Sequence, residues 1–401
     1  MEQANIAGII RVEHMTRTTY LPYSLPLIED NDINEVVDAL KSNWLSKGPK
    51  TLEFENRFAA YVGAKHAIAM NSCTAALHIA LVAKGIGPGD EVITTPLTFA
   101  ATANTIIHTG ARPVFVDVDP ETGCIDASKI EEKITKKTKA IVPVHFGGQA
   151  CEMDTILKLS EDYGLFVSED AAHAIYSTYK GKMIGSIGDA TSFSFYATKN
   201  LCTGEGGMLT TNDDRLAEKA RILSLHGMDK NAWNRYDKNG SWYYEILYPG
   251  YKYNMTDIQA ALGLIQLKKL DEMQRIRETY SQKYNRSFSG VPEITTPRQI
   301  ADNRHSWHLY VIRINDGSLD IDRDQFIKEL AQENIGTSVH FIPLHLHPYY
   351  KATFGYKMGD FPVAEEIFRR SISLPLYPKM AGQDVDNVIE AVEKIVNRYK
   401  K

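Results

Sequence analysis

The chain has 401 residues, of which 43% are hydrophobic and 24% charged, and its formal net charge is −5. This composition is typical of a globular protein with two or three domains. Lysine and arginine are spread along the chain instead of gathered in runs, so we expect no nucleic-acid partner.

Two further features bear on where the protein works. No uninterrupted apolar run approaches the roughly 20 residues that a membrane helix needs, and residues 1–20 lack the apolar core of a signal peptide. The four cysteines, Cys73, Cys124, Cys151 and Cys202, are far apart and form no CxxC pair, which argues against a disulfide framework and a zinc site. We therefore expect a cytoplasmic protein with no membrane segment and no metal.

Helical and strand-like segments alternate from about residue 30. Amphipathic spacing predicts helices, and β-branched runs bounded by glycine or proline predict strands. In chain order the pattern predicts a helix at 32–44 with a cap at Asp30 to Asp32, a strand at 89–96, a helix at 98–110 ended by Gly110, strands at 111–120 and 138–148, a helix at 153–164, and a strand at 165–172. This alternation implies βαβ units, and therefore a mostly parallel sheet with helices on both faces.

The second half of the chain has a different pattern. Residues 227–254 are rich in Tyr, Trp, Asn and Gly and predict a loop, whereas residues 256–288 predict one long helix that leads to a smaller C-terminal part. In that part, strands are predicted at 306–314 and 337–343, and helices at 322–334 and 385–399. We therefore predict a large α/β domain over residues 20–270 and a small α+β domain over residues 271–401.

A lysine and an acid mark the first candidate site. Lys199 lies in SFSFYATKNLCTGEGG, residues 192–207, where strand-like alternation changes to a polar loop that ends in glycines. In α/β proteins, ligands bind at such strand ends. Asp170 ends the apolar strand LFVSED, and a buried carboxylate there needs a cationic or donor partner. A protonated pyridine nitrogen would be such a partner, and Lys199 could form a Schiff base with the aldehyde of the same cofactor, pyridoxal phosphate.

The other parts of a pyridoxal phosphate site can also be found in the sequence. The turn MNSCTAALHIAL runs from a strand into a helix, so the amides of Cys73 and Thr74 could bind the phosphate. Ser194 could donate its hydroxyl to the same phosphate, and Phe99 could cover the pyridine ring. Each residue taken singly also fits a surface lysine, a helix cap or a turn. Their order and spacing together favour the cofactor site.

The chain resembles a known enzyme family over almost its whole length, from about residue 21 to about residue 380. The motifs that carry the resemblance are NSCTAALHIAL, GPGDEVITTPLTFAATAN, GARPVFVDVDP, EDAAHA, SFSFYATKNLCTGEGG and GYKYNMTDIQAALG. By these motifs, in this order, the chain resembles the nucleotide-sugar aminotransferases of the DegT/StrS family. The resemblance implies a fold-type I, aspartate-aminotransferase-like fold, with a mostly parallel central sheet flanked by helices and a smaller α+β C-terminal domain.

The resemblance also implies a role for each matched residue. Lys199 would be the Schiff-base lysine and proton carrier, Asp170 the partner of the pyridinium nitrogen, and Phe99 the aromatic ring stacked on the cofactor. The phosphate contacts would be Cys73, Thr74 and Ser194.

Two more residues follow from the resemblance. His173 takes a position beside the cofactor ring and its phenolic oxygen. Asn254 matches an asparagine that reaches the phosphate of the neighbouring subunit, so the resemblance implies a homodimer with shared active sites.

The family's reaction gives the expected substrates. A ping-pong cycle would take the amino group from glutamate, release 2-oxoglutarate, and then aminate a nucleotide-linked keto sugar. The segments WLSKGP and CTGEGG resemble those of enzymes that act at sugar C4, although Ser46, Lys47 and Cys202 depart from the family pattern. The alternatives are a C3 keto-sugar or aminocyclitol aminotransferase, and a catalytically idle homologue that binds cofactor and sugar to regulate. The intact Lys199 and Asp170 argue against the idle homologue.

Three histidines lie close together in SVHFIPLHLHPYY, at His340, His345 and His347. HxH spacing can place two imidazoles on one strand face. Because no cysteine or carboxylate stands beside them, we expect no metal site. The resemblance places this segment near the sugar cleft, so His340 is the candidate substrate contact.

Overall fold

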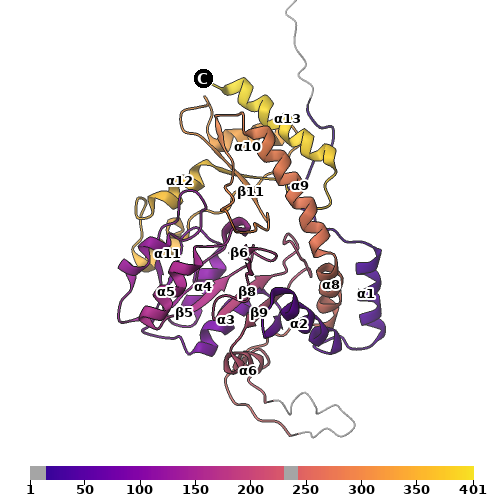
Figure 1. Ribbon diagram of the computed structural model, residues 1–401, viewed down its shortest axis with the longest axis vertical. Helices are drawn as coiled ribbons and strands as arrows, with labels where there is room; N and C mark the ends of the chain where they lie inside the picture. Colours follow the sequence, from indigo (N-terminus) through magenta and orange to yellow (C-terminus); the bar gives the residue numbers. More distant parts are fainter. Residues whose placement is uncertain (1–14, 230–242) are drawn as a thin grey trace, which may run out of the picture.

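The computed structural model describes residues 15–229 and 243–401 (Figure 1). Residues 1–14 of the N-terminal stretch, and residues 230–242 of the loop predicted at 227–254, therefore lie outside the described residues. The described residues of that loop form no helix and only isolated bridges to other segments. Among the described helices, none is both long enough and apolar enough to cross a membrane.

A seven-stranded sheet forms the centre of the large part, with the strand order β1-β9-β8-β5-β4-β2-β3. Its strands are β1 (His66–Met70), β2 (Glu91–Thr94), β3 (Arg112–Phe115), β4 (Thr138–Ile141), β5 (Phe166–Asp170), β8 (Ala190–Ser194) and β9 (Gly207–Thr211). Strand β9 pairs antiparallel with both of its neighbours, whereas the pairs from β8 to β3 are parallel. The predicted α/β fold with a mostly parallel sheet is confirmed.

Helices surround this sheet, and some of them pack on other helices and not on its strands (Figure 1). They are α1 (Asp30–Lys41), α2 (Pro49–Val62), α3 (Cys73–Lys84), α4 (Ala100–His108), α5 (Met153–Tyr163), α6 (Asp214–Leu223) and α8 (Asp257–Lys268), with short 3₁₀ turns η1 (Ala127–Lys129), η2 (Glu131–Lys133) and η3 (Phe146–Gly148) and a small hairpin of β6 (Thr178–Tyr179) and β7 (Lys182–Met183). Helix α5 ends, as the sequence predicts, at a glycine in the left-handed region, Gly164 with φ 65°. The cap of α1 differs from the prediction, because Glu29 and not Asp30 is the N-cap, with Asp32 completing a capping box.

The long helix predicted over residues 256–288 is two helices. Helix α8 begins after a capping box of Thr256 and Gln259, and α9 (Leu270–Phe288) follows at once. Lys269, between them, has φ −100° and ψ 5°, and its ammonium group lies 3.0 Å from the Leu27 carbonyl oxygen. Helix α8 packs on α1 and α2, whereas α9 packs on the C-terminal helix α13. The helix breaks because its two halves align with different cores, which the hydrophobic pattern of one continuous segment does not reveal.

The small part has a sheet and a core of its own. Its antiparallel strands are β10 (Ile294–Thr295), β11 (Tyr310–Ile314) and β12 (Ser371–Leu374), and its helices are α10 (Arg323–Gln332), α11 (Pro348–Phe354), α12 (Pro362–Arg370) and α13 (Gly382–Tyr399), with one 3₁₀ turn, η4 (Leu344–Leu346). Buried residues such as Tyr284, Phe326 and Val392 pack between this sheet and helices α9, α10 and α13. This α+β arrangement agrees with the predicted pattern, and the domain boundary at residue 270 stays a prediction.

The strand predicted over residues 337–343 is wrong. This segment makes a single bridge, between Ser338 and Ser373, and is otherwise irregular. Its alternating side chains suggested a strand, but Pro343 has no N–H to donate to a sheet. The segment instead passes along a cavity, which His340 and Phe341 line.

Two adjacent glycines close the motif that follows Lys199. Gly207 begins β9 and packs directly on the turn before α3. A Cβ atom on Gly207 would lie 2.4 Å from the Ser72 carbonyl carbon and 2.5 Å from the Cys73 nitrogen. Glycine at this position therefore lets the start of α3 approach the sheet.

We expect Gly207→Ala to lower the free energy of unfolding by about 1–3 kcal/mol, because the added methyl group would push two backbone segments apart. The measurement is the urea midpoint followed by far-ultraviolet circular dichroism. Gly290→Ala is the matched control, since a Cβ there would meet no atom within 4 Å, and its midpoint should stay close to that of the parent. Equal midpoints for the two variants would contradict the close-packing explanation.

Candidate active site

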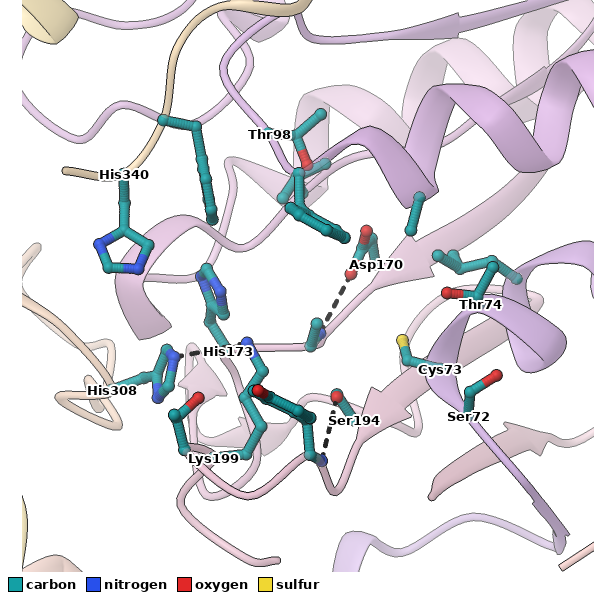
Figure 2. A pocket seen from close by; sticks show the side chains of 18 of the residues that line it. Ser72, Cys73, Thr74, Thr98, Asp170, His173, Ser194, Lys199, His308 and His340 are labelled. Atoms are coloured by element: carbon teal, nitrogen blue, oxygen red, sulfur yellow. Dashed lines mark hydrogen bonds between the residues drawn. The ribbon is translucent and has the colours of Figure 1, made fainter. Parts of the chain in front are cut away.

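A cavity of about 510 Å³ lies at the carboxyl-terminal ends of β5 and β8, where the central sheet meets the small part. Figure 2 shows side chains from several elements turned toward this shared space. The predicted site residues that line the cavity are Cys73, Thr74, Phe99, Asp170, His173, Ser194, Lys199 and His340. The tertiary structure therefore brings together residues that lie far apart in the sequence, such as Cys73 and His340.

Asp170 is the last residue of β5, and its side chain is buried. Its carboxylate accepts hydrogen bonds from Thr102 Oγ1 at 2.7 Å and from the Ala172 amide at 3.1 Å. Burial raises the pKa of this carboxyl group above its usual value, although the two donors and the nearby Lys199 amine act in the opposite direction. A cationic group beside Asp170 would therefore be strongly favoured.

Lys199 lies in the loop between β8 and β9, just past the strand end, as the sequence predicts. Burial lowers the pKa of its amine to about 8, whereas the neighbouring Cys73 and Asp170 act to raise the pKa. Its Nζ atom lies 3.5 Å from Nε2 of His308 (Figure 2). Because an amine with this pKa loses its proton in mildly basic solution, Lys199 is poised to act as a nucleophile and as a base.

The first turn of α3 faces the cavity. Ser72 caps this helix, since its Oγ accepts a hydrogen bond from the Ala75 amide at 3.1 Å. Cys73 and Thr74 are thus the first two helical residues, whose amides have no acceptor within a helix and favour a bound anion. Burial raises the pKa of the Cys73 thiol, so the backbone amide of Cys73, and not a thiolate, is the group available to an anion. Ser194 lines the same cavity.

Aromatic rings form another wall. His173 stacks on Phe341 with ring centroids 5.9 Å apart and an interplanar angle of 19°. Its Nδ1 accepts a hydrogen bond from the Gly147 amide at 3.2 Å. Burial lowers the pKa of His173 well below its usual value, so the ring is neutral and carries its proton on Nε2. The ring centroids of Phe99 and Phe341 lie 6.1 Å apart. Phe99 is 64% exposed, which leaves one face of its ring free for a flat ligand.

Asn254 does not line the cavity of its own chain. Its side chain is buried, and its Nδ2 donates one hydrogen bond, to the Met255 carbonyl oxygen at 3.2 Å. Its Oδ1 has no hydrogen-bond partner within the described part of the chain. The family resemblance assigns this residue to the site of a neighbouring subunit, and that assignment stays a prediction.

Several cavity residues were not identified from the sequence. Among them are Tyr23, Tyr196, His308, Phe341 and Leu376. Thr102, which donates to Asp170 from outside the cavity lining, was not identified either. Thr102 and Tyr196 lie inside motifs already quoted, so the spacing within those motifs could have found them. His308 and Phe341 come from segments that the pattern describes only as strands, and no local signal marks them.

The histidine cluster is dispersed in the structure. His340 Nδ1 lies 2.8 Å from Ser373 Oγ, whereas His345 Nε2 lies 2.8 Å from Glu365 Oε1 in a separate contact. Because the segment is not a strand, the HxH spacing does not place imidazoles on one strand face. Over residues 15–229 and 243–401, no group of three or more His, Cys, Asp or Glu side chains is arranged to hold a metal ion.

Comparisons with known proteins give consistent results. The model of the DegT/DnrJ/EryC1/StrS aminotransferase family matches residues 26–393. The spore coat polysaccharide biosynthesis protein SpsC of Bacillus subtilis (strain 168) is 63% identical to this chain over 381 residues, which is 95% of this chain and 98% of that protein.

Solved structures agree with the family match. Spr1654 from Streptococcus pneumoniae in its PMP form is 38% identical, with a TM-score of 0.88, covering 94% of this chain and 99% of that one. The same protein has been solved in a PLP form. PseC from Helicobacter pylori, an aminotransferase involved in the biosynthesis of pseudoaminic acid, is 31% identical, with a TM-score of 0.88, covering 95% of this chain and all of that one.

The lowered pKa of Lys199 predicts a pH-dependent cost to stability. The folded state disfavours the ammonium form, so the cost is full below pH 8 and disappears as the pH rises from about 8 to 10.5, where the unfolded lysine also loses its proton. We therefore expect Lys199→Met to stabilise the cofactor-free protein at pH 7 by up to about 2 kcal/mol, with a gain that shrinks toward pH 10. Urea midpoints at a series of pH values measure this gain.

The control for this experiment is Lys139→Met, which removes an exposed lysine from the same sheet. Its effect on the midpoint should not vary with pH. A gain in Lys199→Met that stays constant between pH 7 and pH 10 would show that the desolvation explanation is wrong.

Proposed function

The chain belongs to the DegT/DnrJ/EryC1/StrS aminotransferase family, and on this basis we propose that it transfers an amino group from glutamate to a nucleotide-linked 4-keto sugar. The family match confirms the resemblance seen in the sequence motifs, and the chain is a sugar aminotransferase that depends on pyridoxal phosphate. The choice of sugar C4 is supported by the segments at residues 44–49 and 202–207. We further propose that the aminated sugar is a precursor of a polysaccharide, and the similarity to SpsC, a spore coat polysaccharide biosynthesis protein, supports this.

The single observation that carries the proposal is the buried acid and the deprotonatable lysine on the walls of one cavity. Pyridoxal phosphate, when bound, supplies an aldehyde that condenses with amines and a pyridinium ring that withdraws electrons from carbon. The residues present fit this group, because the cavity offers an acid, an amine, a helix N-terminus and a free aromatic face.

Each of these residues has a proposed task. Asp170 would hold a proton at the pyridine nitrogen, and Thr102 and the Ala172 amide fix the direction of its carboxylate. The Lys199 amine would hold the aldehyde and, when free, would carry the proton that leaves the amino donor. The neutral His173 ring can donate a hydrogen bond from its Nε2–H group to an oxygen beside it.

The remaining residues bind and orient. The amides of Cys73 and Thr74 would receive the phosphate, with the dipole of α3 favouring its negative charge, and Ser194 would add a hydroxyl. Phe99 would cover the ring, and His340 would contact the sugar. Because donor and acceptor would occupy the same cavity beside Lys199, they would enter it in turn, which is the basis of the proposed ping-pong order.

A second chain would complete the site through Asn254. The Nδ2 group of this residue has two hydrogens, and its one hydrogen bond within the described residues goes to Met255. The second hydrogen could reach the phosphate bound to a neighbouring subunit. We therefore propose a homodimer in which each subunit contributes to both active sites.

The substrate experiment uses the cofactor-loaded protein. With glutamate alone, the absorbance should shift from the PLP form to the PMP form and 2-oxoglutarate should appear, and a nucleotide-linked 4-keto sugar should restore the PLP form. UDP-, GDP- and dTDP-linked 4-keto and 3-keto sugars are compared, with NMR of the product. Amination at C3 would overturn the choice of C4, and no spectral shift with glutamate would favour a non-catalytic homologue.

The role of Lys199 is tested with the Lys199→Ala variant. We expect turnover to fall by at least about 10³-fold, because no other amine replaces the lost nucleophile and proton carrier. The assay is the rate of 2-oxoglutarate release, and circular dichroism confirms that the variant is folded. Activity close to that of the parent would remove Lys199 from the reaction.

Shared active sites predict complementation between two inactive variants. In a mixed dimer of Lys199→Ala and Asn254→Ala chains, one site carries both changes and the other carries neither. Random pairing makes about half of the dimers mixed, so about a quarter of the parent activity should return on mixing after mild unfolding. If dimers confirmed as mixed by mass spectrometry stayed inactive, the shared-site proposal would fail.

A further inference from the structure

His308 lies two residues before β11, in the wall of the cavity, and only 7% of it is exposed. Figure 2 shows its ring turned toward the end of the Lys199 side chain. The distance from Lys199 Nζ to His308 Nε2 is 3.5 Å. Within the described residues, this contact is the side-chain hydrogen bond of the Lys199 amine. Contacts of catalytic groups are often long before a substrate is bound, so the protonation of His308 becomes the important question.

The amide of Asn200 settles which nitrogen of His308 carries the proton. Asn200 Nδ2 donates to Gln274 Oε1 and to the Ser306 carbonyl oxygen, both at 2.8 Å. Gln274 Nε2 also donates to the Ser306 carbonyl oxygen, at 2.7 Å, which leaves Gln274 Oε1 to face Asn200. Both partners of Asn200 Nδ2 are acceptors, so the orientation of the Asn200 amide is fixed and its Oδ1 faces His308.

Asn200 Oδ1 lies 3.1 Å from His308 Nδ1. An amide oxygen only accepts hydrogen bonds, so His308 Nδ1 must carry a hydrogen. Burial and the positive charges of Lys199 and Arg277 hold the pKa of His308 well below its usual value, so the ring is neutral and has one N–H. The unshared electron pair of Nε2 therefore faces Lys199.

We propose that His308 is a positioning residue for Lys199: its Nε2 accepts one hydrogen of the amine and thereby directs the electron pair of the amine into the cavity. A lysine amine sits on a flexible four-carbon chain and has several orientations of similar energy. A fixed acceptor selects among them, which keeps the amine ready whenever it is free. The proposal rests on the proposed role of Lys199.

Other ionisable groups surround this contact and enter the test. The groups whose charges shift the pKa of His308 or of Lys199 are Cys73, Asp170, His173, Arg277 and His340. His173 is the nearest ring, with its centroid 4.4 Å from that of His308. Within the described part of the chain, none of these groups makes a hydrogen bond to Lys199 Nζ, so removing His308 should have an effect that removing His340 does not.

The first test reads the proton position directly. The cofactor-free, full-length protein is labelled with ¹⁵N in the histidine rings, and NMR spectra are recorded near pH 7. The His308 signals are assigned as those lost in His308→Gln or His308→Asn. We expect a protonated Nδ1 and a bare Nε2, which is the less common form of free histidine. A proton on Nε2, or on both nitrogens, would overturn the proposal.

The second test measures the pKa of Lys199 in the cofactor-free protein. The rate of acetylation of Lys199 by acetic anhydride is followed against pH, with peptide mass spectrometry to read this lysine alone. In His308→Leu the ammonium form loses its acceptor, so we expect the pKa of Lys199 to fall by about one unit. His308→Gln should recover part of the loss, because its Oε1 can accept.

His340→Leu is the matched control, since His340 lines the same cavity but bonds to Ser373. In this variant, the pKa of Lys199 should match the pKa of Lys199 in the parent protein. An unchanged pKa in His308→Leu, or an equal fall in both variants, would overturn the proposal. Neither test needs turnover, so a failure here is distinct from a failure of the Lys199→Ala experiment. The NMR measurement needs only one of its two assignment variants to fold, so it stands where His308→Leu does not fold.

Discussion

The site depends on holding a buried acid and an amine on the walls of one cavity. Burial disfavours the charged form of each group, raising the pKa of Asp170 and lowering that of Lys199. Two donors on Asp170 recover only part of this cost. These two positions therefore lower the stability of the folded protein. A bound cofactor with a positive ring nitrogen and an aldehyde would stabilise the folded protein again.

The two parts of the chain build this cavity together. The central sheet supplies Asp170 and Lys199 at the ends of two neighbouring strands, whereas His308, His340 and Phe341 come from the small part. Cavities between two cores are common ligand sites, because neither core can fill the space with its own side chains. The break between α8 and α9 has the same origin, since each helix packs on a different core.

Hydrogen bonds fix the protonation of the buried histidines. His173 is fixed by the Gly147 amide and His308 by Asn200. Outside the cavity lining, His145 Nδ1 accepts a hydrogen bond from the Cys151 amide, and its Nε2 lies 2.8 Å from Glu169, the residue before Asp170. In each case the hydrogen-bond partner of one ring nitrogen decides which nitrogen carries the proton. Not all of these partners line the cavity, yet they determine whether the ring atoms on its walls donate or accept hydrogen bonds.

The sequence by itself determined the fold class and placed Asp170 and Lys199 at strand ends, because strand alternation, glycine stops and strand-end motifs are local patterns that follow from backbone geometry. The family resemblance added His173 and His340 to the predicted site. The sequence did not determine the break at Lys269, the irregular path of residues 337–343 or the place of His308. Those features depend on which core a segment packs against and on partners more than 70 residues away, such as Gln274 for Asn200. Only the tertiary structure could decide them, because a hydrogen bond or a packing contact of that separation leaves no trace in the local pattern.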